Sequence, residues 1–251
     1  MITSGILNMN CKINTTAYNP NKTIKITERW PAHDQDLHTP ELYQQMVKAL
    51  FEVERDTDPG VDMDSYMVVY IDKYGLYKEW AKYDEEPIKR GKFHVIYEAR
   101  DGGNYQMFNK AYQLIKHNYD YFIFTCDDIM VFGDQYYKKL IDRWNEESGI
   151  GYLAVQGGGE THEPQNHVQG SIGMTTKKIL EEVCGINNGE LPHPKSEPWT
   201  QEANIREGEI PFTHRILELG YRFVNYNNSK TWRRENLCFP YLNYIRNYAD
   251  Q

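Results

Sequence analysis

The stretch Tyr121–Phe132, YFIFTCDDIMVF, is mostly apolar until two carboxylates, Asp127 and Asp128, interrupt it. A run this rich in aromatic and apolar residues is typical of a strand buried on both faces. Carboxylates at the end of such a strand are costly to bury unless a cation or hydrogen bonds compensate them. The pattern predicts that Asp128 and Asp127 hold a hard divalent cation, which can bind a diphosphate. The alternative is that one of the two caps the following turn.

Three further segments have the pattern of buried strands. They are SYMVVYID (65–72), KFHVIYEA (92–99) and GYLAVQ (151–156). Between them, apolar residues recur at helical spacing at about 40–55, 74–83 and 105–115, and again after Asp134. This alternation predicts an α/β fold with a mostly parallel sheet flanked by helices, and ligands gather at the carboxyl ends of such strands.

The second half of the chain is less regular. It predicts a loop with glycines and histidines (157–170), a short helix capped at Thr175 or Thr176 and ended by Gly185, and a helix from about Pro211 to Gly220. RFVNYNN (222–228) is expected to be a further strand. No linker divides the chain, so we expect one domain over residues 1–251.

Composition limits the classes of protein to consider. The 251 residues, 40% hydrophobic and 25% charged, are ordinary for a globular protein, and the net charge of -8 argues against a large basic nucleic-acid face. Four widely spaced cysteines without a C-x-x-C motif argue against structural zinc and a disulfide framework. With no membrane-span pattern and no signal-peptide pattern, we expect a cytoplasmic protein.

Two strand ends carry weaker signals. Asp72 ends SYMVVYID and suits a ribose hydroxyl or a base amide, although a turn residue is the alternative. Arg100, Asp101 and Gly103 precede a helix whose N-terminus could face a phosphate, and the alternative is a plain capped loop. No G-x-G-x-x-G and no P-loop is present, and HEPQNH (162–167) lacks the spacing of a zinc-protease motif.

Three stretches together resemble GT-A glycosyltransferases, particularly those of the family 2 type. They are GGNYQMFNKAYQLIKHNYDYFIFTCDDI (102–129), GSIGMTTKKILEEVCG (170–185) and GEIPFTHRILELGYRF (208–223). The first is similar to the family's approach to its D-x-D motif, with Asn109 on the preceding helix. The second, which begins at Gly170, is similar to the segment that meets the sugar and the acceptor. The third is similar to the helix near the catalytic base.

The resemblance implies a Rossmann-like sheet, a nucleotide-sugar donor, commonly UDP-linked, and Mn²⁺ or Mg²⁺. Residues of about 1–150 would form the nucleotide-sugar half, and residues of about 151–251 the acceptor half. Asp128 matches the last acid of D-x-D, whereas Cys126 replaces the first acid and Asp127 takes over part of its role. Ile210 stands where the family's catalytic Asp would follow Glu209.

Glu209 is therefore the expected base and His214 the second candidate, while the stereochemistry of transfer stays open. The alternative for Glu209 is a first-turn acid that interacts with the helix dipole. Further on, Trp232 stands beside Arg233 and Arg234. This tail is expected to cover the donor diphosphate or to clamp an acceptor. The alternative is a packed C-terminal segment with solvated arginines.

Three classes of function remain open on sequence grounds. The first is a hexosyl- or pentosyltransferase that acts on a glycan, a small molecule or, as a special case, a hydroxymethylated base in DNA. The second is a metal-dependent nucleotidyltransferase or another phosphate-processing enzyme that uses the same two acids. The third is a non-catalytic sugar- or nucleotide-binding module, which the departures at Cys126 and Ile210 keep open.

Overall fold

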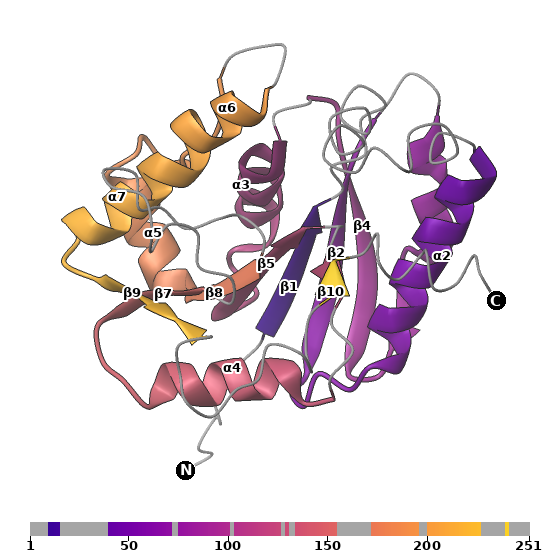
Figure 1. Ribbon diagram of the computed structural model, residues 1–251, viewed down its shortest axis with the longest axis horizontal. Helices are drawn as coiled ribbons and strands as arrows, with labels where there is room; N and C mark the ends of the chain where they lie inside the picture. The colour runs from indigo at the N-terminus through magenta and orange to yellow at the C-terminus, as the bar shows by residue number, and fades with distance from the viewer. Residues whose placement is uncertain are drawn as a thin grey trace.

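The computed structural model describes residues 10–15, 40–71, 75–100, 103–126, 129–130, 134–154, 172–195, 200–226 and 239–240. In these ranges an eight-stranded sheet lies between helices (Figure 1). In spatial order its strands are β3 (Glu86–Ile88), β4 (Gly91–Glu98), β2 (Met63–Tyr70), β1 (Asn10–Thr15), β5 (Tyr121–Cys126), β8 (Ile172–Thr176), β7 (Ile150–Ala154) and β9 (Arg222–Asn225). A separate pair joins β6 (Ile129–Met130) to β10 (Phe239–Pro240).

The helical segments follow the expected order along the chain. They are α2 (Pro40–Asp56), the 3₁₀ segment η2 (Leu76–Tyr83), α3 (Gly103–Ile115), α4 (Tyr136–Asn145), α5 (Lys177–Gly185), α6 (Gln201–Ala203), the π-helical turn η3 (Asn204–Glu209) and α7 (Ile210–Glu218). No helix within the described ranges is long and apolar enough to cross a lipid bilayer.

The prediction of a mostly parallel sheet is wrong, because the sheet is mixed. Four neighbouring pairs of strands are parallel and three are antiparallel. The strand β8 runs antiparallel to both of its neighbours, β5 and β7, and the short edge strand β3 runs antiparallel to β4. The segment that forms β8 was assigned only a helix cap at Thr175 or Thr176, so its pairing was missed.

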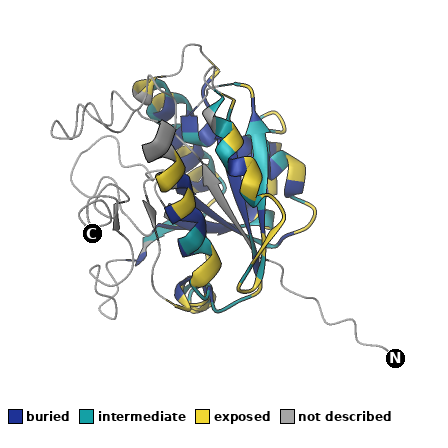
Figure 2. Ribbon diagram, turned by 90° about the vertical axis from the view of Figure 1, so that its right-hand side faces the viewer, coloured by how far each residue is buried: buried dark blue, intermediate teal, exposed yellow. Residues whose placement is uncertain are grey.

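Alternation along the strands gives the sheet two apolar faces. In β2, Tyr66 and Val68 belong to a core shared with α3, α5 and α7, whereas Met67 and Val69 belong to a core shared with α2 and η2. On the latter face, α4 covers β5 and β7 with a third cluster. The helices bury their inner faces and expose their outer ones (Figure 2). Helices therefore cover both sides of the sheet, as the continuous apolar strands predict.

The first strand was not placed by the sequence alone. Residues 12–18, KINTTAY, alternate in polarity as strand residues do, and the structure puts β1 in the middle of the sheet, parallel to both β2 and β5. Residues 22–30, KTIKITERW, alternate in the same way, but they lie outside the described residues. The N-terminal segment therefore contributes to the sheet that presents the candidate site.

Candidate functional site

The candidate site is built on the edge formed by the carboxyl ends of β1, β2, β4 and β5, which we term the carboxyl edge. These four strands are parallel neighbours, so their ends meet on one side of the sheet. Cys126, the last residue of β5, lies level with Thr15 of β1, and Tyr70 of β2 lies level with Glu98 of β4. In an open α/β sheet, this is the side on which ligands bind.

Several predicted site residues fall outside the described residues, although the chain enters their segments from the carboxyl edge. Asp127 and Asp128 directly follow β5, and Asp72 and Asp101 follow β2 and β4 by a few residues. The full set outside the described residues is Asp72, Asp101, Asp127, Asp128, Gly170, Trp232, Arg233 and Arg234. Their roles stay predictions. Arg100, Gly103, Asn109, Glu209 and His214 can be placed.

Arg100 lies just beyond β4, where Glu98 forms a polar end to the strand. The carboxylate of Glu98 is buried, accepts the Arg100 N–H at 3.0 Å and lies 3.8 Å from Lys110 Nζ. The Arg100 guanidinium donates to the Pro194 carbonyl at 3.0 Å. Glu98 was missed by the sequence reasoning, although it is the next-to-last residue of KFHVIYEA and Asp72 is the last residue of SYMVVYID.

Asn109 holds α3 against the segment Leu191–Lys195. Its buried Oδ1 accepts the Leu191 N–H at 2.9 Å, and Gln113 donates to the Gly189 carbonyl at 2.9 Å one turn later on the helix. Arg100 reaches the same segment through Pro194. The structure thus brings two predicted residues, Arg100 and Asn109, onto one loop, and Asn109 has a clear structural contact there.

His193 in this loop is a buried group that sequence reasoning missed. Its Nδ1 lies 2.7 Å from the Leu191 carbonyl, which identifies Nδ1 as the protonated nitrogen, and its Nε2 lies 2.9 Å from Lys195 Nζ. Burial lowers the pKa of His193, and the nearby Lys195 acts in the same direction. The hydrogen bond from Lys195 lowers the pKa of Glu190. A neutral imidazole therefore lies next to an ion pair close to the carboxyl edge.

Gly103 begins α3 in the left-handed region, at φ 70°, where glycine is favoured. The helix N-terminus was expected to be open to a phosphate. One of its amides is already used, because the Tyr105 N–H donates to Asn204 Oδ1 at 3.4 Å. Asn204 belongs to η3, so this contact joins the start of α3 to the segment that carries Glu209.

Glu209 is the last residue of η3 and is buried, with 8% of its surface exposed. Asn204 Nδ2 donates to its Oε1 at 3.2 Å, and the Glu209 carbonyl accepts the Thr213 hydroxyl at 2.8 Å. The side chain is therefore held inside the protein beside α3. An acid that only interacts with the helix dipole could face the solvent, so burial does not follow from that alternative. Single π-helical turns are rare and are frequent at functional sites.

His214, the second predicted base, is exposed and lies five residues after Glu209. Five residues along an α-helix correspond to a rotation of roughly 140°, so the two side chains leave the helix in different directions. The structure does not bring these two candidate bases together. Glu209 is the one that contacts the start of α3, through Asn204.

The C-terminal segment returns to the carboxyl edge through β10. Ile129 of β6 pairs with Pro240, and Met130 pairs with Phe239, in an antiparallel arrangement. Ile129 is the residue after Asp128, so β10 reaches the immediate sequence neighbour of the acid pair. The sequence carries no signal for this pairing, since it joins two strands of two residues each.

Another acid and histidine cluster lies where the chain enters β3, beside the middle of β4, with Asp84, Glu85 and His94 as possible metal ligands. Glu85 already contacts Lys92 at 2.9 Å and His94 at 2.8 Å, and Asp84 accepts the Val95 N–H. The hydrogen bond from Lys92, followed by that from His94, lowers the pKa of Glu85. The charges in this cluster are thus compensated within the protein.

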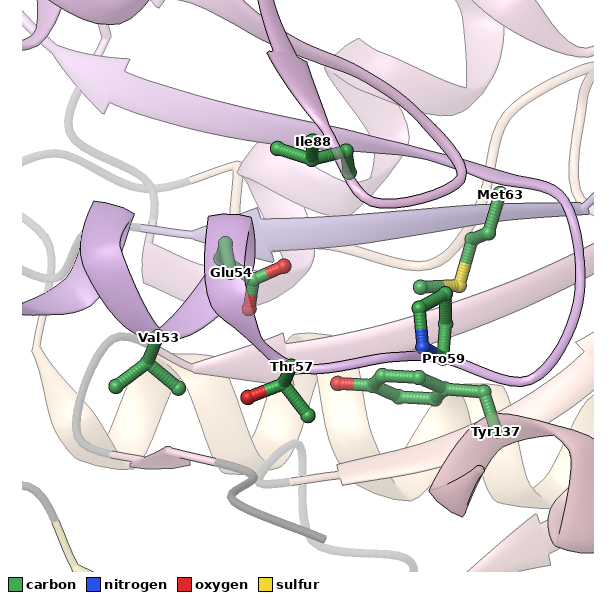
Figure 3. A pocket seen from close by; sticks show the side chains of 7 residues that line it. All are labelled: Val53, Glu54, Thr57, Pro59, Met63, Ile88 and Tyr137. Atoms are coloured by element: carbon green, nitrogen blue, oxygen red, sulfur yellow. The ribbon is translucent and has the colours of Figure 1, made fainter. Parts of the chain in front are cut away.

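A small pocket lies at the amino end of β2, away from the carboxyl edge (Figure 3). It is lined by Val53, Glu54, Thr57, Pro59, Met63, Ile88 and Tyr137. The centre of a water molecule can occupy only about 10 Å³ of it, which suits one water and no larger ligand. This pocket is not a candidate for nucleotide or sugar binding.

No protein-family model and no curated protein sequence matches the chain. Among solved structures, it is similar to Drosophila β1,4-galactosyltransferase 7 with manganese, UDP-Gal and xylobiose, at 13% identity and TM-score 0.47, over 94% of this chain and 73% of that chain. It is also similar to S. aureus TarS 1-349, at 11% identity and TM-score 0.45, over 88% and 59% of the two chains.

A third similar structure is 4-diphosphocytidyl-2C-methyl-D-erythritol synthase from Anaerococcus prevotii, at 9% identity and TM-score 0.45, over 97% of both chains. With TM-scores below 0.5, these likenesses decide neither the substrate nor the activity. The chain is an α/β protein with a mixed sheet, and its similarity to these solved structures is distant.

Proposed function

We propose that the chain is a metal-dependent glycosyltransferase that moves a sugar from a nucleotide-sugar, with UDP as the expected nucleotide, to an acceptor hydroxyl. The pairing of β6 with β10 is the observation that supports it most. It returns the C-terminal segment to the residue that follows Asp128. Two acids and a basic aromatic segment, more than 100 residues apart in sequence, each lie within a few residues of this strand pair along the chain.

Chain length bounds how far the basic segment can lie from that edge. Five peptide units separate Arg234 from Phe239, and a fully extended chain of that length spans at most about 18 Å. Asp128 is adjacent to Ile129, whose partner is Pro240. Arginine side chains within this radius can reach a diphosphate that is held by a cation on the two acids.

The proposed chemistry divides the work between these groups. Asp128 and Asp127 would hold Mn²⁺ or Mg²⁺, which neutralises the diphosphate leaving group. Trp232, Arg233 and Arg234 would cover the diphosphate. Glu209 would take the proton from the acceptor hydroxyl while the acceptor oxygen bonds to the anomeric carbon. Its burial beside the start of α3 supports its choice over the exposed His214.

The test is product analysis with a panel of nucleotide-sugars and Mn²⁺. The proposal predicts release of a nucleoside diphosphate from at least one donor, by hydrolysis or transfer, and loss of this release when the metal is chelated. A nucleotidyltransferase would instead form or consume a nucleotide-sugar with exchange of pyrophosphate. Pyrophosphate chemistry without diphosphate release, or no thermal stabilisation by any nucleoside diphosphate with Mn²⁺, contradicts the proposal.

The acceptor is proposed only as a hydroxyl, on a glycan, a small molecule or a hydroxymethylated base in DNA. The acidic net charge of -8 opposes the DNA case, and the basic C-terminal segment favours it. A gel shift with duplex DNA that carries hydroxymethylated bases separates the two. Binding that weakens with added salt supports a DNA acceptor, and no binding at any salt concentration eliminates it.

A further inference from the structure

Asn204 stands between the carboxylate of Glu209 and the first turn of α3. Its Nδ2 donates to Glu209 Oε1 at 3.2 Å, and its Oδ1 accepts the Tyr105 N–H at 3.4 Å. All three residues are buried, with 5%, 8% and 3% of their surfaces exposed for Asn204, Glu209 and Tyr105. Because a backbone N–H can only donate, the amide must turn its oxygen to Tyr105 and its nitrogen to Glu209.

The π-helical turn is what makes this contact geometrically possible. In a regular α-helix, residues five apart point roughly 140° away from each other. The turn Asn204–Glu209 is π-helical, and this wider turn relates residues five apart. The first and last residues of η3 therefore share one side of the helix.

Close packing fixes this side of η3 against α3. A Cβ atom added at Gly208 would lie 2.8 Å from the Cβ of Tyr105, so only glycine allows the approach. Figure 1 shows α6 and α7, the helices that flank η3 in the chain, beside α3. The packing of η3 on α3 thus fixes the position of Asn204 between Tyr105 and Glu209.

We propose that Asn204 is a positioning residue that orients the Glu209 carboxylate toward the acceptor and links that orientation to α3. This rests on the proposed function, in which Glu209 is the base. In the step concerned, the acceptor O–H bond breaks and its proton goes to Glu209. The acceptor oxygen bonds to the anomeric carbon, and the bond from that carbon to the diphosphate breaks, with the electron pair leaving on the nucleoside diphosphate.

Asn204→Asp tests the role with an isosteric change. The introduced aspartate can still accept the Tyr105 N–H, but it presents an oxygen instead of an N–H to Glu209. Loss of base orientation is expected to lower kcat by about 10- to 100-fold. The KM for the donor should stay within about twofold, since donor binding does not need the base. Asn118→Asp, an exposed site with the same change of charge, is the control and should keep wild-type kcat.

Exchanging the hydrogen-bond donor and acceptor between residues 204 and 209 separates the effect of their pairing from the effect on catalysis. In the double variant Asn204→Asp/Glu209→Gln, the introduced glutamine amide can donate to the introduced aspartate. The Tm that Asn204→Asp loses is expected to return toward the wild-type value in the double variant. Its kcat should stay at the level of Glu209→Gln alone, because the base is absent. Losses of kcat that add instead contradict action through Glu209.

Each remaining outcome decides the proposal. Wild-type kcat in Asn204→Asp, or in Asn204→Ala if the aspartate variant does not fold, overturns the positioning role. If the wild-type protein turns over no nucleotide-sugar, the proposed function itself fails. In an inactive protein, recovery of Tm in the double variant would show that Asn204 and Glu209 form a pair with a structural role only. The positioning role would then fail because the proposed function fails, and not because the two residues do not interact.

Discussion

Asn109 lies on the helix that precedes the acid pair, and its side-chain oxygen accepts the Leu191 N–H at 2.9 Å. Asn109→Ala leaves that buried N–H without a partner, which is expected to lower the free energy of unfolding by about 1–3 kcal/mol. Urea denaturation measures the difference. Asn118→Ala, at an exposed position, is the control and should change the free energy of unfolding by less than about 0.5 kcal/mol. Equal urea midpoints for wild type and Asn109→Ala would contradict the structural role.

His193 makes stability depend on pH in a direction that the structure fixes. Burial lowers the pKa of His193, and the charged groups that face it are Lys195, Glu190 and Arg100. An unfolded histidine binds a proton near pH 6.5, so below that pH the unfolded state binds more protons than the folded state. Folding stability should therefore fall as the pH drops below about 6.5.

The measurement for His193 is urea denaturation at several values between pH 8 and pH 5. His193→Gln should reduce the loss of stability on acidification, while His117→Gln, at an exposed histidine, should leave it as in the wild type. If the wild type and His193→Gln lose the same free energy of unfolding over this range, the buried histidine is not the cause.

Some site residues could be predicted one at a time and others could not. Arg100 and Glu209 follow from local signals, a strand end and a helix start, and both lie at the carboxyl edge or beside α3. Asn204 contacts Tyr105, which is distant in sequence, and the loop that carries His193 is held on α3 by the distant Asn109. Local pattern carries no information on such contacts.

At the scale of elements, the π-helical turn is the least regular and most testable part of the fold. Gly208→Ala would push a Cβ to 2.8 Å from Tyr105, and the displacement of η3 from α3 is expected to cost about 1–3 kcal/mol. Gly185→Ala is a matched control, because its added Cβ meets nothing within 4 Å at the end of α5. Equal Tm values for the two variants would contradict the packing of η3 on α3.

Elements with strong periodicity were predicted well, and those set by tertiary pairing were not. The helix at 40–55 is α2, and the expected helix from Pro211 is α7. Asp134 precedes α4 but does not cap it, because its carboxylate accepts the Asp58 N–H at 2.8 Å from the loop after α2. The strand β8 gains its place only by pairing with β5 and β7.

At the scale of the molecule, strands from both halves of the chain form one sheet, from β1 near the N-terminus to β9. The predicted division into a nucleotide-sugar half and an acceptor half stays a prediction. The return of β10 to β6 could not be read from the sequence, because two-residue strands have no periodicity. It is the feature that relates the C-terminal segment to the carboxyl edge.

Removing the two cations of this segment tests that relation. Arg233→Ala/Arg234→Ala is expected to raise the KM for the nucleotide-sugar by about tenfold or more, because charge-assisted bonds to the diphosphate are lost. The Tm should stay close to that of the wild type. Lys48→Ala/Lys178→Ala removes two exposed cations, 65% and 77% exposed, as a charge-matched control. An unchanged KM in the arginine variant would show that the C-terminal segment does not contribute to donor binding.

Asp128, two residues after β5 in the chain, is proposed to hold the metal on which transfer depends. The most direct test measures the rate at which nucleoside diphosphate is released, with Mn²⁺, from a donor that the wild type turns over. The wild type is compared with Asp128→Asn, whose Tm must equal that of the wild type to show that the variant is folded. Loss of the metal's several kcal/mol of stabilisation predicts a rate at least about 100-fold lower, with a smaller loss in Asp127→Asn and none in the exposed control Asp142→Asn. Full activity in a folded Asp128→Asn protein would contradict the metal site and the proposed mechanism with it.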